Sequence, residues 1–321
     1  MALIGCQDAA VSSIAGIGPI GTIRKVVSGH EFTEGPTVDA KGNIYFSDLN
    51  EEKVFRVMAN GSESTFIEES RRANGLMFDA TRNRLLACES GAGAEPGIAR
   101  IVAFGLDDGS LEVVVPGYGG QPFNRVNDLV IDRQGGIYFS DILGGEPELP
   151  QEAAAVYYAA RDGTVSRVIT GLDRPNGVLL SPDEETLYVL PYGSVTLMSY
   201  DVVAPGVLGV GRVLTALPKS EDNPRAGGDG MTVDSEGNLY VALPASMAIV
   251  VISPKGEILG SIPIPEAPSN AIFGGPDRKT LYVTARTSLY AIPMEATGHT
   301  FGEVPSQVPK ESQRIDHDSA E

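Results

Sequence analysis

The chain has 321 residues, and its 24 Lys and Arg against 42 Asp and Glu give a formal net charge of −18 at pH 7. Nucleic acid and anionic membrane surfaces are therefore poor partners. Its 38 Gly and 22 Pro among 42% hydrophobic residues indicate a core with many turns, which excludes a coiled coil, a helix bundle and a disordered chain. No apolar stretch reaches the roughly 18 residues of a membrane span.

One sequence plan recurs six times along the chain. Each copy has a polar residue, usually a small residue, three mostly apolar residues, a turn and a short apolar strand. The copies pair residues 34–39 with 44–46, 74–79 with 85–87, 127–132 with 137–139, 176–181 with 187–189, 229–234 with 239–241, and 270–275 with 281–283. Asp, Gly, Asn and Pro at the turns, followed by Ile, Leu, Tyr and Val, are typical of a β-hairpin.

Each repeat contains further strands. A third apolar segment follows each hairpin, at residues 54–58, 100–104, 155–159, 196–201, 249–252 and 289–292. With one more short strand before the next copy, a repeat of about 40–50 residues holds four strands, which is typical of a β-propeller blade. We predict an all-β, six-bladed β-propeller over residues 23–304, with the ring closed by strands from the two ends of the chain.

The residues outside the repeats bear on location. The sequence from Leu3 to Cys6 matches the small-residue box before the lipid-modified cysteine of bacterial lipoproteins, so Cys6 is a candidate lipid anchor of a periplasmic or secreted protein. The five residues before Cys6 are too few for the apolar stretch of a secretory signal, so a chance match in a cytoplasmic protein stays open. We assign residues 1–22 to a tether or the remnant of an export signal, and residues 305–321 to a polar C-terminal tail.

Every repeat begins with a side chain that carries an oxygen acceptor. These side chains are Glu34, Asn74, Asn127, Asn176, Asp229 and Asn270. If the first strand of each hairpin is innermost, the six acceptors converge at one mouth of the central channel. A cation would relieve their repulsion, and an all-oxygen set favours Ca²⁺, then Mg²⁺ or Mn²⁺, and Zn²⁺ less. Capping of the strand's own backbone by Asn and Asp is the alternative explanation.

Several of these segments resemble a known family. Four segments resemble the signature of the gluconolactonase family, which includes senescence marker protein (regucalcin) and the luciferin-regenerating proteins. These segments are Glu34-Gly35-Pro36, Arg125-Val126-Asn127-Asp128, Pro175-Asn176-Gly177 and Gly228-Asp229-Gly230-Met231. Three further segments are similar to sequences of the bacterial gluconolactonase branch, namely Asn74-Gly75-Leu76, Cys88-Glu89 and Phe273-Gly274-Gly275-Pro276-Asp277. The resemblance covers about Lys25 to Pro293.

The resemblance implies a six-bladed propeller with a central metal site. One divalent cation, usually calcium, would be held through Glu34, Asn176 and Asp229. Asn127, together with Arg125, would contact the metal or the substrate, and Asp229 would double as the general base. Asp229, Asn127 and Arg125 are therefore the candidate catalytic residues, and Asn127 is also a candidate metal ligand.

Some positions fit the family pattern less well or stay open. Whether Asn74 and Asn270 contact metal or substrate is not decided by the sequence. Val126 stands where many bacterial members have proline, and Ser90 stands where many have histidine, which weakens any assignment of sugar contacts to the loop of Ser90. His30, four residues before Glu34, is expected to be a satisfied surface histidine.

We therefore expect a metal-dependent hydrolase that opens a sugar-type lactone, with a metal-activated water as nucleophile and an Asp as general base. Arg125 could hold a substrate hydroxyl or carboxylate, or stabilise the oxyanion. Two alternatives use the same site: hydrolysis of another ester, lactone or phosphotriester, and binding of calcium or a ligand without turnover. The expected partner is a small lactone or ester.

Overall fold

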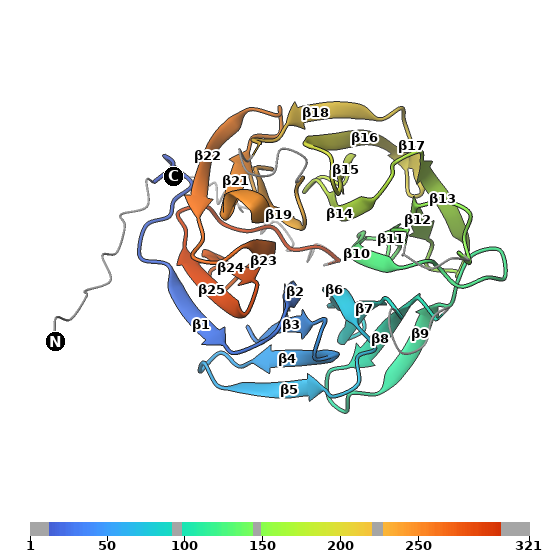
Figure 1. Ribbon diagram of the computed structural model, residues 1–321, viewed down its shortest axis with the longest axis horizontal. Coiled ribbons are helices and arrows are strands. Elements are labelled where there is room, and N and C mark those ends of the chain that lie inside the picture. Colours follow the sequence, from blue (N-terminus) through green and yellow to red (C-terminus); the bar gives the residue numbers. More distant parts are fainter. Residues whose placement is uncertain (1–12, 92–97, 144–148, 220–226, 303–321) are drawn as a thin grey trace, which may run out of the picture.

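The computed structural model describes residues 13–91, 98–143, 149–219 and 227–302. In these residues the chain forms six antiparallel sheets around a central axis, as Figure 1 shows. The helical structure in this part of the chain is one short 3₁₀ turn, Pro244–Ser246, and none of it is long and apolar enough to cross a membrane. The arrangement confirms the prediction of an all-β, six-bladed β-propeller.

The first three blades follow one another along the chain, each beginning with its innermost strand. Blade 1 consists of β2 (Thr33–Val38), β3 (Ile44–Asp48), β4 (Lys53–Val57) and β5 (Glu63–Ile67). Blade 2 consists of β6 (Ala73–Asp79), β7 (Arg84–Glu89), β8 (Arg100–Gly105) and β9 (Leu111–Val115). Blade 3 consists of β10 (Val126–Ile131), β11 (Ile137–Asp141), β12 (Ala155–Ala159) and β13 (Val165–Thr170).

The last three blades complete the circle. Blade 4 consists of β14 (Pro175–Leu180), β15 (Thr186–Pro191), β16 (Thr196–Ala204) and β18 (Arg212–Ala216), and β17 (Val207–Leu208) pairs with the end of β16. Blade 5 consists of β19 (Met231–Val233), β20 (Leu239–Leu243), β21 (Ala248–Ile252) and β22 (Ile258–Pro263). Blade 6 consists of β23 (Pro268–Gly274), β24 (Thr280–Ala285), β25 (Ser288–Pro293) and β1 (Arg24–Ser28).

The ring is closed by β1, which lies at the outer edge of blade 6 (Figure 1). It pairs antiparallel with β25, and Arg24 lies opposite Ala291 while Ser28 lies opposite Ser288. The last blade therefore contains strands from both ends of the chain, which confirms the predicted closure.

The segment before β1 packs on the propeller where the structure describes it. Ile17 is buried in one apolar cluster with Ile292 and Met294 of blade 6. The backbone N–H of Ile20 donates to the carbonyl of Pro293 at 2.9 Å. These residues lie within the segment assigned to a tether, so part of that segment is held against the fold. Residues 1–12, which include Cys6, and the tail lie outside the described residues.

Buried aspartates fix three of the hairpin turns, at Asp39, Asp132 and Asp234. In each turn Oδ1 accepts two backbone N–H bonds of 2.8 to 3.0 Å from the loop. The second oxygen accepts a bond of 2.9 to 3.2 Å from the hydroxyl of Tyr45, Tyr158 or Tyr240. The turn residue of the repeat is therefore structural, and it ties the turn to the second strand in blades 1 and 5 and to the third strand in blade 3.

The core lies between neighbouring blades, because both faces of the inner strands are covered. In β3 and β11, which share the sequence Ile-Tyr-Phe-Ser-Asp, every residue is buried. The outermost strands β5 and β9 are largely exposed or half-buried. Burial thus increases toward the axis, where polar side chains must find partners within the protein.

Candidate metal centre and active site

The six acceptor side chains lie where the innermost strands begin. These strands form a closed ring of neighbours, in which β2 contacts β6 and β23, β10 contacts β6 and β14, and β19 contacts β14 and β23. Five acceptors belong to innermost strands, and Asp229 stands two residues before β19. The first strand of each hairpin is therefore innermost, which meets the condition under which the six acceptors converge at one mouth.

The innermost strands are irregular where they carry these residues. The pairing register shifts between Glu34 and Thr37, Ala73 and Leu76, Val126 and Leu129, Pro175 and Val178, and Pro268 and Asn270. A bulge of this kind interrupts the regular alternation of a strand and redirects a side chain. The repeated motif of the sequence therefore corresponds to a repeated bulge beside the axis.

Glycine follows most of the acceptors because the next blade passes very close. A Cβ on Gly177 would lie 2.5 Å from the carbonyl oxygen of Asp229, and a Cβ on Gly230 would overlap the side chain of Asn270. Real side chains do not tolerate such contacts, so these positions need glycine for the blades to meet around the axis. The acceptor-glycine pattern is thus partly a requirement of packing.

The three residues that the resemblance implied as metal ligands interact at the axis. Asn176 Nδ2 donates to Oδ1 of Asp229 at 2.9 Å. Burial raises the pKa of Asp229 to about 7, and the bond from Asn176 opposes this rise. Burial also raises the pKa of Glu34 well above its ordinary value, and the charge of Asp229 raises it further. Two carboxylates are therefore held close together where water cannot stabilise their charges.

Backbone capping, the alternative explanation for the repeated acceptors, occurs at two of the six positions. Oε2 of Glu34 accepts the N–H of Gly35 at 3.1 Å, and Oδ1 of Asn270 accepts the N–H of Ala271 at 2.8 Å. Glu34 keeps a second carboxylate oxygen, whereas the amide of Asn270 interacts with Asp128 and lowers its pKa. Asn270 is thus engaged by the protein itself.

Asp128 is the axial residue that the sequence analysis did not single out. It is buried beside the innermost strand of blade 2, because a Cβ on Gly75 would lie 2.6 Å from its Oδ1. Burial raises its pKa to about 7, and the charge of Asp229 raises it further, while the N–H of Leu129 opposes the rise. The repeat did contain a signal for Asp128. The position after the acceptor is Gly or Ala in the other five copies, so a charged residue there is an exception.

Asn127 and Arg125 stand at the beginning of blade 3, and both are half-buried. The backbone N–H of Arg125 donates to Oδ1 of Asp141 at 2.6 Å, and that of Asn124 donates to Oδ2 at 3.1 Å. Burial raises the pKa of Asp141 to about 7, and these two bonds oppose the rise. The buried Asp141 therefore fixes the loop from which Arg125 and Asn127 extend.

Arginine recurs at one repeat position in three consecutive blades. Arg72, Arg125 and Arg174 each stand two residues before the acceptor of their blade. Since the loops that enter the innermost strands lie at the same end of the axis, the three arginines start from one side of the mouth. Although the net charge of the chain is −18, these arginines place hydrogen-bond donors at one side of the mouth, where they can bind hydroxyl or carboxylate oxygens.

The donor set at the axis suits a hard divalent cation. Glu34 and Asp229 supply carboxylate oxygens, Asn176 and Asn127 can supply amide oxygens, and Asp128 adds a third buried negative charge. Oxygen ligands of this kind are the preferred set of Ca²⁺. Burial is the largest cause of the raised pKa values of the three carboxyl groups, and the charge of Asp229 adds to it at Glu34 and Asp128; a bound cation would oppose both causes.

The chain is similar to known proteins in sequence and in fold. The sequence model of the SMP-30/Gluconolactonase/LRE-like region matches residues 32–287, a range that includes all six acceptors. The chain belongs to this family. This membership confirms the resemblance that the sequence motifs carry.

Relatives of this chain are known in bacteria. It is 30% identical to the gluconolactonase of Zymomonas mobilis subsp. mobilis over 296 residues, which cover 86% of this chain and 82% of that protein. It is 28% identical to lactonase drp35 of Staphylococcus saprophyticus over 239 residues, which cover 72% and 69%. Among solved structures, the gluconolactonase of Xanthomonas campestris matches with a TM-score of 0.75 and 28% identity, over 85% of this chain and 89% of that chain.

Proposed function

We propose that this protein opens a sugar-type lactone to its acid with the help of one divalent cation, Ca²⁺ first among the candidates. Its family and its relatives, which are named gluconolactonase and lactonase, make it a lactonase in general terms. The finer proposal places the cation on Glu34, Asn176, Asp229 and Asn127. It is supported by one observation, the 2.9 Å bond between Asn176 and Asp229 beside the second buried carboxylate, Glu34.

Asp229 is the proposed general base. When bound, a divalent cation would polarise the lactone carbonyl and acidify a water molecule. The bond from Asn176 orients the Asp229 carboxylate, and burial brings its pKa in the ion-free protein to about 7. Because a bound cation would lower this pKa again, proton transfer to Asp229 relies on the cation having acidified the water. Asp229 is also a proposed ligand, so its loss should remove both binding and proton transfer.

Arg125 and Asn127 are proposed to act on the substrate. Asp141 holds the backbone of Arg125, so the guanidinium starts from a fixed point at the mouth. Donors aimed at the developing oxyanion contribute about 3–4 kcal/mol in well-ordered sites. The Asn127 amide can donate to a substrate oxygen or accept from a substrate hydroxyl.

The direct test is proton release from glucono-1,5-lactone, followed with a pH indicator in weak buffer. We expect turnover that is lost after chelation and restored by Ca²⁺ or another of Mg²⁺, Mn²⁺ and Zn²⁺. Asp229→Ala and Glu34→Ala should lose metal and activity together while the fold is largely kept, and Asn127→Ala should keep metal better than either. Normal turnover in Asp229→Ala or Glu34→Ala would refute the assignment of the site.

The same measurement separates the alternatives. Tight metal binding without turnover of this lactone would favour another lactone, an ester or a phosphotriester, which can be offered to the same loaded protein. Absence of turnover with all of these substrates would favour a propeller that binds calcium or a ligand without catalysis.

A further inference from the structure

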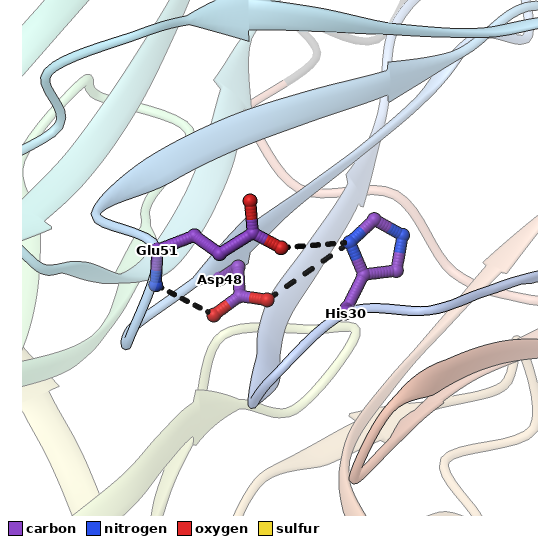
Figure 2. Close-up of side chains that lie close together, drawn as sticks. All are labelled: His30, Asp48 and Glu51. Atoms are coloured by element: carbon purple, nitrogen blue, oxygen red, sulfur yellow. Dashed lines mark hydrogen bonds and ion pairs between the residues drawn. The ribbon is translucent and has the colours of Figure 1, made fainter.

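A second cluster of potential metal ligands lies within blade 1. Figure 2 shows His30 from the loop before β2 facing Asp48 at the end of β3 and Glu51 in the loop that follows. His30 Nδ1 is 3.9 Å from Oδ2 of Asp48 and 3.9 Å from Oε1 of Glu51. The three ligand atoms all lie within 4.8 Å of one another. This site uses none of the axial side chains and does not depend on the proposed function.

His30 is not the satisfied surface histidine that the sequence predicted. Its side chain is only 6% exposed, and neither ring nitrogen has a hydrogen-bond partner among the described residues. Nε2 lies 2.8 Å from Oε1 of Glu63, without the alignment of a hydrogen bond. A buried imidazole between carboxylates, with no bond to satisfy its nitrogens, requires an explanation.

Comparison with blade 3 shows that the fold itself does not need a histidine here. His30 packs edge-on against Phe46 at 4.9 Å between ring centroids, and Phe123, four residues before Asn127, packs edge-on against Phe139 at the same distance. His30 and Phe123 stand at the same repeat position, four residues before the acceptor, and their ring partners stand on the second strand of each blade. Blade 3 thus fills this place with phenylalanine, and the ring nitrogens of His30 are an addition to the packing.

Asp48 gives the cluster a rigid anchor. It is fully buried, and its oxygens accept backbone N–H bonds from Glu31 at 2.7 Å, Phe32 at 3.2 Å, Asn50 at 3.0 Å and Glu51 at 3.1 Å. Asp141 holds the corresponding loop of blade 3 in the same way. A carboxylate that backbone donors hold in one orientation is preorganised to bind a cation through its remaining lone pairs.

The spacing of the ligand atoms suits an ion between them. Two ligands that each lie about 2.1 Å from a tetrahedral ion are roughly 3.4 Å apart, so the 3.9 Å gaps require only a small closure. Glu51 can supply this movement because its side chain is partly exposed, and the same exposure gives an ion access from solvent. Glu63 lies close enough to Nε2 that a small rotation of the ring would let it accept the N–H, as a carboxylate commonly does behind a metal-ligating histidine.

We propose that His30, Asp48 and Glu51 form a second divalent-cation site in blade 1, selective for an ion that accepts imidazole. One nitrogen with carboxylate oxygens suits Zn²⁺, or another first-row transition ion, better than Ca²⁺. The site lies on the loop that leads directly into Glu34. A bound ion joins this loop to the end of β3 and the turn after it.

The test measures Zn²⁺ binding to the full chain by equilibrium dialysis, with excess Ca²⁺ present to occupy any oxygen-ligand site. We expect one equivalent of Zn²⁺ in the wild type, loss of that equivalent in His30→Phe, and at least tenfold weaker binding in Glu51→Gln. His30→Phe introduces the residue of blade 3, so its melting temperature should stay near that of the wild type. Glu68→Gln removes the same charge from an exposed side chain nearby and should bind Zn²⁺ like the wild type.

Two results would overturn the proposal. The first is absence of Zn²⁺ binding to the Ca²⁺-saturated wild type. The second is equal Zn²⁺ binding by His30→Phe and wild type. In that case Zn²⁺ should displace Ca²⁺ and Glu34→Gln should abolish Zn²⁺ uptake, because the ion would occupy the axis. If His30→Phe does not fold, Co²⁺ added to the wild type decides the matter, since it must give a paramagnetically shifted imidazole resonance that Glu51→Gln weakens and Glu68→Gln retains.

Discussion

Replacing Asp229 with asparagine tests two effects of its buried negative charge. The charge should destabilise the ion-free fold, and it should contribute to binding of the cation. In the ion-free protein, burial moves the pKa of Asp229 from 3.8 to about 7. Each pH unit of that difference corresponds to about 1.4 kcal/mol, so keeping the carboxylate ionised costs the ion-free fold on the order of 4 kcal/mol. The introduced carboxamide retains an oxygen that can accept the bond from Asn176. The ion-free Asp229→Asn protein should therefore be more stable than the wild type at pH 8, by up to this amount.

The pH dependence follows from the direction of the shift. Because the folded protein binds the proton more tightly than the unfolded chain, the ion-free wild type loses stability as pH rises from about 4 to about 7. The carboxamide of the Asp229→Asn variant does not titrate, so the stability difference between variant and wild type should be smaller at pH 5 than at pH 8. Added Ca²⁺ should stabilise the wild type at pH 8 and have little effect on the variant.

Urea unfolding at pH 5 and pH 8, with a chelator and then with Ca²⁺, measures the unfolding free energies of wild type and variant, their pH dependence and their change on Ca²⁺ binding. Asp162→Asn is the matched control, because Asp162 is exposed and its pKa is lowered by the backbone N–H of Thr164, so removing its charge should not stabilise the protein. An ion-free Asp229→Asn protein that is less stable than wild type at pH 8 would refute the reasoning. So would equal stabilisation of both proteins by Ca²⁺.

Other changes test the packing and the site. Gly230→Ala forces a Cβ into the next blade and should cost about 1–3 kcal/mol in urea unfolding, whereas Gly209→Ala, whose Cβ would meet its nearest atom at an ordinary 3.5 Å, should cost much less. Tyr240→Phe removes a buried 3.0 Å bond to a turn aspartate and should lower the unfolding free energy by about 1 kcal/mol. Arg125→Met should lower kcat/KM on the order of 100-fold in the proton-release assay and leave the Kd of Ca²⁺ unchanged, a result that a purely structural arginine would not give. The Kd of Ca²⁺, measured by calorimetry, should fall as pH rises from 5 to 8, because Asp128 and Asp229 release their protons over this range.

The blades were predictable because their signals are local and repeated. The turn residue of each copy, such as Asp39 or Asp234, marks a hairpin, and six copies determine the number of blades. Closure by β1 followed from the same count, since a blade has four strands and the last repeat needs a fourth. The innermost place of the first strand was suggested by blade geometry, and the convergence of the acceptors depended on it.

Contacts between blades were less accessible to sequence reasoning. The repeat gives the position of Asp128 along its strand, but not that its carboxylate reaches the glycine of the neighbouring blade. His30 is polar and precedes a strand, so the sequence indicated a surface residue. The structure buries it because its ring takes the place that Phe123 takes in blade 3. Such contacts depend on how two repeats pack, which the pattern within one repeat does not contain.

The pairing of β1 with β25 has a consequence for synthesis of the protein. The ribosome makes β1 before any other strand of the propeller, and its partner is made last, so β1 waits with an unpaired edge while almost the whole chain emerges. Glu34, Asn176 and Asp229 have all left the ribosome before β25 is complete. They come together only in a ring in which β2 lies beside β23. A nascent chain stalled before the last blade should therefore contain every proposed ligand of the axial cation and still fail to retain the ion.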